Sequence, residues 1–397
     1  MSAIETTPPL TRTSVQEAHA LIKPYIHLTP TITSTTLTTI ASTPQSPSTL
    51  VDTEWEGQTP ANPVIRFFFK CENQQRIGAF KARGAFHALA RLGVEGRRGG
   101  VVTHSSGNHA QALALAAKTF GIPAHIIMPT ISTPSKIAGT KAQGAHVIFS
   151  GSTSKEREAV LVEVMKEHPN AVVVPPYDHP DIILGQGTAS LELQQQVQEL
   201  GQELDAIIAP LGGGGLLGGT ATAMSGTGIR VFGAEPRFQG ANDGERGLKA
   251  GKRVEDVSTL TIADGLRTPV GCINWSVISD AEKVKGNFSV TEEQIKKAMR
   301  LVLERMKTVV EPSGCVPLAV ALYNEDFRRL VEKEAGEKGW NVGIIFSGGN
   351  TTVEAIGKLF EQPKEEEERA EGKIVLFQLE IDAVALLAAW FSDPDLE

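Results

Sequence analysis

The stretch VVTHSSGNHAQALALAAK, residues 101–118, joins a short β-branched run to an alanine-rich run through a polar turn. Valine and threonine favour a strand, whereas alanine and leucine favour a helix. Further apolar runs, each followed by turn residues, occur at AHIIMP, AHVIFS, AVVVPP, AIIAPLGGGG, IRVFGAEP and GIIFSGGN. Parallel strands need crossover connections and are usually buried on both faces. The recurring succession of strand, turn and helix therefore predicts an α/β fold with mostly parallel strands.

Helices are predicted over residues 78–92, 108–120, 185–200 and 291–307. The last of them opens with Thr291 and Gln294, a capping-box pattern. The segment 42–63 carries four prolines and the segment 361–373 is a charge run. Both are predicted to be solvated surface loops rather than sites.

The composition excludes several classes of protein. With 397 residues and 41% hydrophobic content, the chain is long enough for two domains with buried cores. The net charge of −8 argues against a nucleic-acid binder but leaves small anionic ligands possible. Three scattered cysteines make neither a disulfide framework nor a CxxC metal pair. We find no signal peptide and no apolar run long enough for a membrane span, so we expect a soluble, cytoplasmic protein without a membrane partner.

Lys81 lies in GAFKARGAF, flanked by glycines and directly after the apolar Phe80. A single helical lysine is usually a solvated residue. A lysine that forms a Schiff base instead needs close approach of its partner and a lowered pKa, and this setting permits both.

The glycine-rich loop PLGGGGLLGG follows the apolar strand AIIAP. Glycines let backbone N–H groups converge, and a helix N-terminus adds partial positive charge, so the loop suits a phosphate. A tight turn that needs positive φ explains it equally well. The loop matches neither GxGxxG nor GxxxxGK[ST].

The polar turn SSGNH precedes the alanine-rich helix. Free N–H groups at the helix start and the serine hydroxyls would seat a substrate carboxylate. The alternative is an ordinary N-cap, which needs one such residue rather than five. SGGN, residues 347–350, ends another strand at the sheet edge where open α/β folds bind ligands, or it is a turn.

The motifs FFFKCENQQRIGAFKARGA, THSSGNHAQALALAAK, GQGTASLEL, APLGGGGLLGG, GAEP, TIADGLRTPVG, ERMKTVVEPSG and FSGGN occur in this order. Together they resemble the serine racemase and serine/threonine dehydratase family of fold-type II pyridoxal-phosphate enzymes, over nearly the whole chain except the proline-rich segment and the C-terminal tail. The resemblance implies two open α/β domains with mostly parallel twisted sheets. Residues 1–99 and 179–397 would form the large cofactor-binding domain, and 100–178 a small domain that closes over the substrate.

The resemblance also implies roles for residues. Lys81 would carry the cofactor as a Schiff base, and Ser106 would be a second acid/base on the opposite face. The expected cofactor-binding residues are Phe80, Lys81, Asn108, Gly212, Gly213, Gly214, Gly215, Leu216 and Ser347, with Asn108 at the cofactor's 3-oxygen and Ser347 facing its pyridine nitrogen. The expected residues for a small amino-acid substrate are Ser105, Ser106, Gly107, Asn108, His109 and Arg157. A homodimer is expected.

Relatives in this family hold a divalent cation, which here would use Glu235, the main-chain carbonyl of Ala241 and Asp243. Oxygen ligands suit magnesium, manganese or calcium, and we expect Mg²⁺ or Mn²⁺. EPRFQGAND is about two residues longer than the usual spacing, so the expectation depends on whether Asp243 still reaches Glu235.

A neutral serine facing the pyridine nitrogen makes a weaker electron sink than a carboxylate, which favours rapid loss of a β-leaving group. We therefore expect an ammonia-lyase (dehydratase) of β-hydroxy amino acids such as L-serine, L-threonine or 3-hydroxyaspartate, giving a 2-oxo acid and ammonia, with serine racemase activity as well. The alternatives are a racemase of serine or aspartate, a β-replacement enzyme of the cysteine-synthase type, and a catalytically silent cofactor-binding module. The cysteine-synthase type is disfavoured because HSSGNH replaces its Thr-rich loop. A feedback-regulated threonine deaminase is disfavoured by the short stretch after Asn350.

Overall fold

The computed structural model describes residues 7–105, 107–152 and 154–361. The chain divides into two compact units, residues 1–350 and 351–397. In the second unit the described residues include helix α15, Val353–Phe360, whose N-terminus is capped by the Thr352 hydroxyl. All the other helices and strands of the described residues belong to the first unit.

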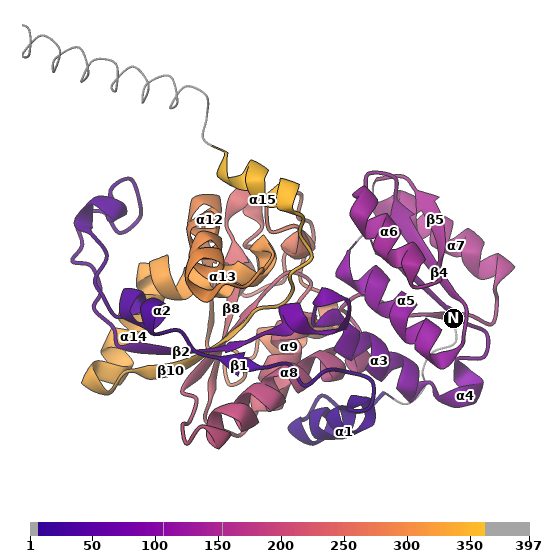
Figure 1. The fold of residues 1–397 in the computed structure, drawn as a ribbon, viewed down its shortest axis with the longest axis horizontal. Helices are drawn as coiled ribbons and strands as arrows, with labels where there is room; N and C mark the ends of the chain where they lie inside the picture. Colours follow the sequence, from indigo (N-terminus) through magenta and orange to yellow (C-terminus); the bar gives the residue numbers. More distant parts are fainter. Residues whose placement is uncertain (1–6, 106, 153, 362–397) are drawn as a thin grey trace, which may run out of the picture. The chain divides into compact units, whose positions relative to one another are not determined.

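Two separate sheets organise this first unit (Figure 1). The six-stranded sheet has the order β1 (Thr31–Ile32), β2 (Ile65–Lys70), β10 (Trp340–Ile345), β7 (Ala206–Pro210), β8 (Arg230–Pro236) and β9 (Gly286–Val290). The four-stranded sheet has the order β5 (His146–Ser150), β4 (Ala124–Pro129), β3 (Val101–His104) and β6 (Val172–Val173). All neighbouring strands are parallel except the pair β1 and β2. The predicted α/β fold with mostly parallel strands is therefore confirmed.

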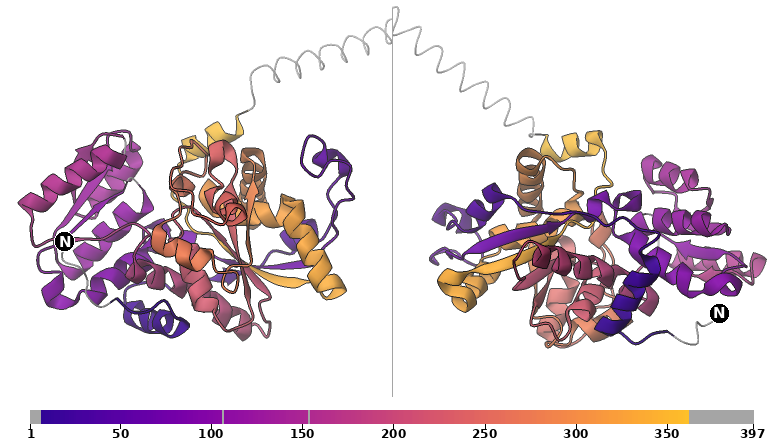
Figure 2. Two further views of the ribbon diagram at one scale, coloured as in Figure 1. Left: turned by 180° about the vertical axis from the view of Figure 1, so that it is seen from behind. Right: turned by 60° about the horizontal axis from the view of Figure 1, so that its bottom comes forward.

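Most helices of this unit lie in the chain between successive parallel strands. They are α1 (Arg12–Ile22), α2 (Thr35–Ala41), α3 (Lys81–Arg91), α4 (Gly93–Gly96), α5 (Asn108–Phe120), α6 (Pro134–Ala142), α7 (Ser154–Glu167), α8 (Pro180–Glu199), α9 (Gly215–Met224), α10 (Asp243–Ala250), α11 (Cys272–Ile278), α12 (Glu292–Leu301), α13 (Pro312–Tyr323) and α14 (Glu325–Ala335). Helices α5, α6 and α7 surround the four-stranded sheet, as the views from two further sides also show (Figure 2). That sheet falls within residues 100–178, the range expected for the small domain.

One of the four predicted helices, 108–120, has the predicted bounds, and the other three differ for local reasons. Helix α3 begins at Lys81 rather than at residue 78, because Gly78 has a φ of +69°. Helix α8 begins at Pro180 rather than at residue 185, since proline is favoured in a first turn and His179 caps it. Helix α12 has the predicted capping box but ends at Leu301, after which a π-helix, η6 (Val302–Met306), closes the segment.

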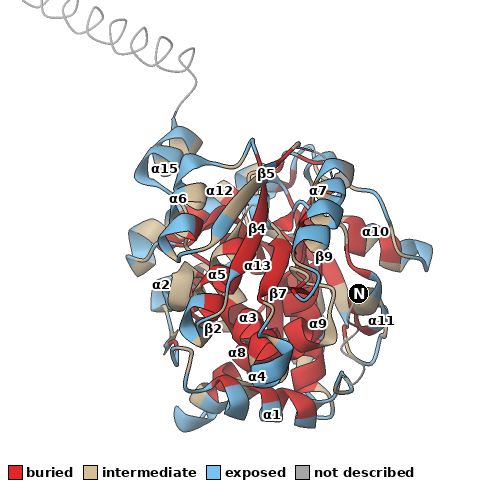
Figure 3. Ribbon diagram, turned by 90° about the vertical axis from the view of Figure 1, so that its right-hand side faces the viewer, coloured by how far each residue is buried: buried red, intermediate tan, exposed pale blue. Residues whose placement is uncertain are grey.

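Small residues allow close packing of α8 against α9 beside the six-stranded sheet. Every residue of α9 is buried, and Figure 3 shows α8, α9 and β7 largely buried. A Cβ atom on Gly219 would lie 2.4 Å from the Ile183 carbonyl oxygen, so only glycine fits there. This packing fixes the N-terminus of α9, where the glycine-rich loop ends. Among the described residues, no helix is both long enough and apolar enough to cross a membrane.

The proline-rich segment 42–63 is not simply a solvated loop. Its Leu50, Trp55 and Ala61 are buried, and the Trp55 indole Nε1 donates to Asp326 Oδ1 at 2.9 Å. The segment is therefore anchored to α14. The other predicted surface loop, 361–373, lies outside the described residues except for Glu361.

Candidate active site

Lys81 begins helix α3 and lies against the end of strand β10. The backbone N–H of Phe80 donates to the Ser347 carbonyl at 3.0 Å, so the residue that precedes Lys81 is bonded to Ser347. The Lys81 side chain is half-buried, and its Nζ donates to the Pro176 carbonyl at 2.7 Å. Burial lowers the pKa of Lys81 to about 8. The uncharged amine, which a nucleophile or base requires, is therefore far more populated near neutral pH than in an ordinary lysine.

A buried ion cluster holds α3 in place two residues after Lys81. Arg83 pairs with Glu72 at 2.7 Å and with Glu192 at 2.6 Å, and Lys70 pairs with Glu192 at 2.7 Å. All four side chains are at most 2% exposed. Burial opposes ionisation of Glu192, but Arg83 holds its pKa well below the usual range. Because this cluster joins α3 to the end of β2 and to α8, it fixes the position of Lys81 relative to both elements.

The glycine-rich loop links β7 to α9 and has no room for side chains. Gly214 has a φ of +96°. A Cβ on Gly212 would lie 2.8 Å from Leu266 Cα, and one on Gly213 would lie 2.4 Å from Tyr177 Cγ. The interpretation as a tight turn is thus correct. The loop also leads into the N-terminus of α9. The first N–H groups of this helix have no acceptor within the helix, so they can bind an anion. Leu216, the second residue of α9, has a side chain that is 3% exposed.

Asn274 and Tyr177, which the sequence analysis missed, pack against this loop. The Asn274 amide Nδ2 donates to the Gly213 carbonyl at 2.9 Å and to the Tyr177 carbonyl at 3.1 Å. Asp178 accepts from the backbone N–H of Asn274 at 3.1 Å. Since the adjacent Pro176 carbonyl receives the Lys81 ammonium, the glycine loop, residues 176–178 and Lys81 form one site.

Asn108, at the start of α5, is held by two residues to which the sequence analysis gave no individual role. Its Nδ2 donates to Glu311 Oε1 at 2.9 Å, and its Oδ1 accepts from Asn350 Nδ2 at 2.8 Å. The Asn350 N–H donates to Glu311 Oε2 at 3.0 Å. Burial raises the pKa of Glu311 to about 7. Both residues occur in the motifs ERMKTVVEPSG and FSGGN, which were the available signal.

Of the remaining residues of the polar turn, Ser105 directly follows β3 and His109 lies in the first turn of α5. Ser105 Oγ accepts from the Gly107 N–H at 3.4 Å. His109 is buried, its Nε2 lies 3.3 Å from the Val174 carbonyl, and burial lowers its pKa to about 3. His109 is therefore neutral at physiological pH. Ser106 lies outside the described residues.

Arg157, in α7, reaches the same edge of the four-stranded sheet. It donates to the Ser152 carbonyl at 2.9 Å. Burial lowers the pKa of His104, and the charge of Arg157 lowers it further, so the guanidinium lies within electrostatic reach of the end of β3. Burial raises the pKa of Tyr177, and the charge of Arg157 slightly opposes this rise.

Glu235 and Asp243 form a buried carboxyl pair. Glu235, in β8, is fully buried and accepts the N–H groups of Gly244 at 2.8 Å and Glu245 at 2.7 Å. Asp243 is 2% exposed and accepts from the Val270 N–H at 3.0 Å. Burial and the nearby Asp243 raise the pKa of Glu235 well above its usual range.

The loop that carries the third expected ligand is compact. It contains a short turn, η4 (Phe238–Gly240), and Ala241 is buried directly after this turn. Among the described residues no three His, Cys, Asp or Glu side chains are grouped to hold a metal. A cation here would therefore need a backbone carbonyl such as that of Ala241 in addition to the two carboxylates.

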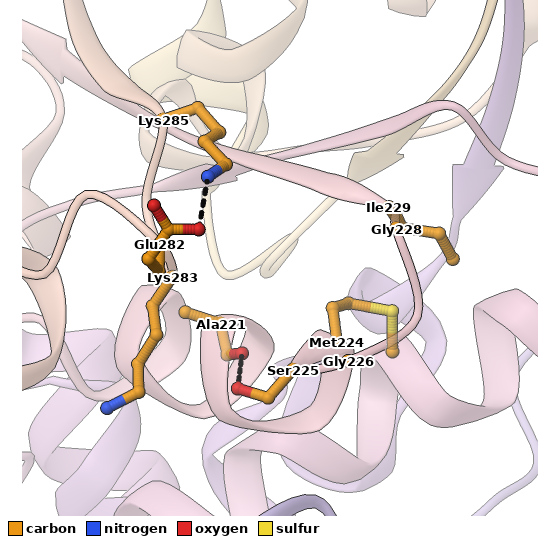
Figure 4. A pocket seen from close by; sticks show the side chains of 9 residues that line it. All are labelled: Ala221, Met224, Ser225, Gly226, Gly228, Ile229, Glu282, Lys283 and Lys285. Carbon is orange, nitrogen blue, oxygen red and sulfur yellow. Dashed lines mark hydrogen bonds and ion pairs between the residues drawn. The ribbon is translucent and has the colours of Figure 1, made fainter.

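A hollow of about 230 Å³ lies at the opposite end of α9 from the glycine loop (Figure 4). Its lining residues are Ala221, Met224, Ser225, Gly226, Gly228, Ile229, Glu282, Lys283 and Lys285. Lys285 is 3.5 Å from Glu282, so part of its charge is already compensated. The first residue of α9 that lines the hollow, Ala221, lies about 9 Å along the helix from Gly215, and no residue assigned to the Lys81 site lines the hollow.

The sequence was compared with protein families and with known proteins, and these comparisons show its family. The family model described as "Pyridoxal-phosphate dependent enzyme" matches residues 53–348. Serine racemase of Arabidopsis thaliana is 40% identical over 353 residues, covering 88% of this chain and 96% of that protein. L-threo-3-hydroxyaspartate ammonia-lyase of Saccharomyces cerevisiae is 42% identical over 297 residues, covering 74% of this chain and 86% of that protein.

A solved structure gives the same result for the fold. Maize serine racemase superposes with a TM-score of 0.76 at 39% identity, covering 91% of this chain and 98% of that chain. With a family match over most of its length and relatives of this identity, the chain belongs to the pyridoxal-phosphate dependent enzymes of fold-type II.

Proposed function

We propose that this protein is an ammonia-lyase that removes water and then ammonia from small β-hydroxy amino acids, with racemisation of serine as a second activity. The observation that carries the proposal is the placement of the half-buried Lys81, with its pKa lowered to about 8, beside the neutral Ser347. The relatives support it, because proteins named serine racemase and hydroxyaspartate ammonia-lyase match this chain at nearly equal identity.

The residues fit pyridoxal phosphate. The glycine loop offers backbone N–H groups at a helix start for the phosphate, where a Cβ at Gly213 would collide with Tyr177. Lys81 supplies the amine for the aldehyde, Asn108 an amide for the ring oxygen, and Ser347 a hydroxyl for the ring nitrogen. When bound to the amino acid, the cofactor withdraws electrons from its Cα and so acidifies the Cα–H bond.

Lys81 then acts as the base that takes the Cα proton. Its lowered pKa leaves part of the amine free to accept that proton near pH 8. The β-hydroxyl leaves with a proton as water, and hydrolysis of the remaining unsaturated amine gives the 2-oxo acid and ammonia. Ser106 is proposed to exchange a proton on the opposite face, which would interconvert the enantiomers. The N-terminus of α5 and Arg157 are proposed to hold the substrate carboxylate.

A second candidate is a racemase whose main product is the D-amino acid. It is favoured by the Arabidopsis relative named serine racemase, which covers more of this chain than the ammonia-lyase relative does. Both activities begin with the same proton transfer to Lys81, so they differ only in the later steps.

We also propose an Mg²⁺ or Mn²⁺ site formed by Glu235, the Ala241 carbonyl and Asp243. Two adjacent buried carboxyls and a backbone carbonyl are an oxygen donor set that suits these ions. The ion would offset the repulsion between the two carboxylates, and binding only to the folded chain would stabilise it.

Closure of residues 100–178 over the substrate is a further part of the proposal. Lys136, in α6 beside the four-stranded sheet, forms an ion pair with Asp264 in η5 (Asp264–Leu266). Leu266 lies against Gly212, so this ion pair connects the smaller sheet to the glycine loop.

The test is a panel of substrates. The purified protein, supplied with pyridoxal phosphate, is incubated with the L- and D-forms of serine and threonine and with L-threo-3-hydroxyaspartate. Both the 2-oxo acid and the enantiomer of the remaining amino acid are measured. We expect 2-oxo acid from at least one L-β-hydroxy amino acid as the main product. Formation of a D-amino acid with little 2-oxo acid would establish the racemase instead, and neither product would contradict both.

A further inference from the structure

The proline-rich segment 42–63 reaches the loop that follows Glu235. The Glu54 carboxylate accepts two hydrogen bonds from the Arg237 guanidinium, at 2.8 and 2.9 Å. Arg237 lies two residues beyond Glu235 in the chain. Such a bidentate pair fixes orientation as well as distance. It holds the pKa of Glu54 below its usual range.

Glu54 itself is held firmly, although it is partly exposed. The adjacent Trp55 is 4% exposed and donates to Asp326 in α14. Farther along the segment, the Ala61 N–H donates to Glu325 Oε2 at 2.8 Å. These two contacts attach the segment to α14 beside and beyond Glu54, so Glu54 can act as a fixed point for Arg237.

The loop between Glu235 and Asp243 needs such a fixed point. Gln239 has a φ of +51°, a left-handed conformation that costs a non-glycine residue about 1 kcal/mol or more. Neighbouring contacts maintain it: Thr259 donates to the Phe238 carbonyl at 2.8 Å, and the Leu260 N–H donates to Gln239 Oε1 at 2.8 Å. By its sequence, this loop is expected to exceed the family spacing by about two residues, and a longer loop has more alternative conformations to exclude.

A continuous series of hydrogen bonds joins Arg237 to the carboxyl pair. Arg237 Nε donates to Ser289 Oγ at 3.3 Å, and that hydroxyl donates to Glu245 Oε2 at 2.5 Å. The N–H of Glu245 in turn donates to Glu235 Oε2 at 2.7 Å. Arg237 is therefore connected to both carboxyl-bearing segments. Its backbone belongs to the loop that follows Glu235, and its side chain reaches helix α10 through Ser289.

We propose that Glu54 is a positioning residue for the divalent cation: through Arg237 it holds the extended loop so that Ala241 and Asp243 face Glu235. This inference rests on the cation site proposed above. It assigns the proline-rich segment, which lies outside the family motifs, a role in cation affinity. Glu54 does not touch the ion, so its effect is on affinity rather than on the number of ions bound.

The experiment compares Mn²⁺ binding by the wild type, Glu54→Gln and Glu54→Asp. Each protein is loaded with pyridoxal phosphate, freed of cations with a chelator, dialysed and titrated with MnCl₂ by calorimetry. Thermal unfolding is measured with and without MnCl₂. Glu54→Gln keeps the shape but loses the charge, and we expect its Mn²⁺ affinity to fall about 3- to 10-fold. Glu54→Asp keeps the charge and should recover part of the loss.

The matched control is Glu334→Gln, which removes a surface ion pair at the opposite end of β8 from Arg237. Glu334 pairs with Arg230, the first residue of β8, at 3.1 Å, and both side chains are 37% exposed. We expect the Glu334→Gln variant to bind Mn²⁺ with the same affinity as the wild type. Glu54 and Glu334 variants with equal affinities, or an effect of Glu54→Gln on thermal stability alone, would overturn the inference and leave the cation site intact. A wild type that binds no Mn²⁺ would overturn both.

Discussion

Replacing Glu311 by glutamine tests the buried contact that holds Asn108. The Glu311 side chain is 5% exposed and accepts from Asn108 at 2.9 Å and from the Asn350 N–H at 3.0 Å. Glutamine has the same shape but only one acceptor oxygen, so one of these two donors loses its partner. An unsatisfied buried donor costs about 1–3 kcal/mol.

The same substitution has a second effect on the free energy of unfolding, which has the opposite sign and depends on pH. Burial raises the pKa of Glu311 from 4.5 to about 7; the nearby Asp264 raises it and Lys136 lowers it. Between these values the folded state keeps the proton and the unfolded state loses it, so this group's contribution to stability falls as pH rises from about 4.5 to 7. Between pH 5.5 and pH 7 the loss amounts to about 2 kcal/mol, at about 1.4 kcal/mol per unit. Because glutamine does not ionise, the Glu311→Gln variant lacks this contribution to the dependence of stability on pH.

The assay is denaturant unfolding of the cofactor-free wild type and Glu311→Gln at pH 5.5 and pH 8. Other titrating groups are common to both proteins and cancel in the difference. We expect the variant to be less stable than the wild type at pH 5.5, and its relative stability to improve by about 2 kcal/mol at pH 8. A difference that does not change with pH, or that grows at pH 8, would refute the reasoning about Glu311.

Three further substitutions test other parts of the site. Gly213→Ala places a Cβ 2.4 Å from Tyr177 Cγ, so pyridoxal phosphate binding measured by fluorescence titration should weaken about tenfold or more. Gly96→Ala, with 3.4 Å to its nearest neighbour, should bind the cofactor normally. Arg83→Leu leaves Glu72 and Glu192 without their shared partner, and we expect a loss of about 3–5 kcal/mol in the free energy of unfolding; a loss below about 1 kcal/mol would show that the cluster is not tightly coupled. Ser106→Ala should lower serine racemisation and D-serine elimination by on the order of 10²-fold while L-serine elimination falls far less, and equal losses would contradict a face-specific role.

The sequence predicted the elements that carry strong local signals. The alternation of β-branched runs with helical patterns indicated the parallel strands, and Thr291 with Gln294 indicated a capping box that the structure contains. Strand β9, GNFSV, was not predicted because a polar residue interrupts its short apolar pattern. The start of α8 at Pro180 was missed although proline in a first turn is a recognisable signal.

Contacts between distant segments could not be predicted in the same way. Lys70, Glu72 and Arg83 look like ordinary charged residues in the sequence, and only the fold brings Glu192 beside them. Likewise, the role of Glu54 depends on Arg237, far along the chain. The homodimer and the cytoplasmic location stay predictions from the sequence.

Borohydride reduction combined with peptide mapping tests the assignment of Lys81 most directly. Reduction of the wild type loaded with pyridoxal phosphate should leave a single pyridoxyl group, found by mass spectrometry on the peptide that contains Lys81, since this lysine combines a lowered pKa with a position beside the glycine loop and Ser347. Lys81→Ala, treated identically, should carry no label and form no 2-oxo acid. A label on another lysine of the wild type, or equal labelling of Lys81→Ala, would contradict the account.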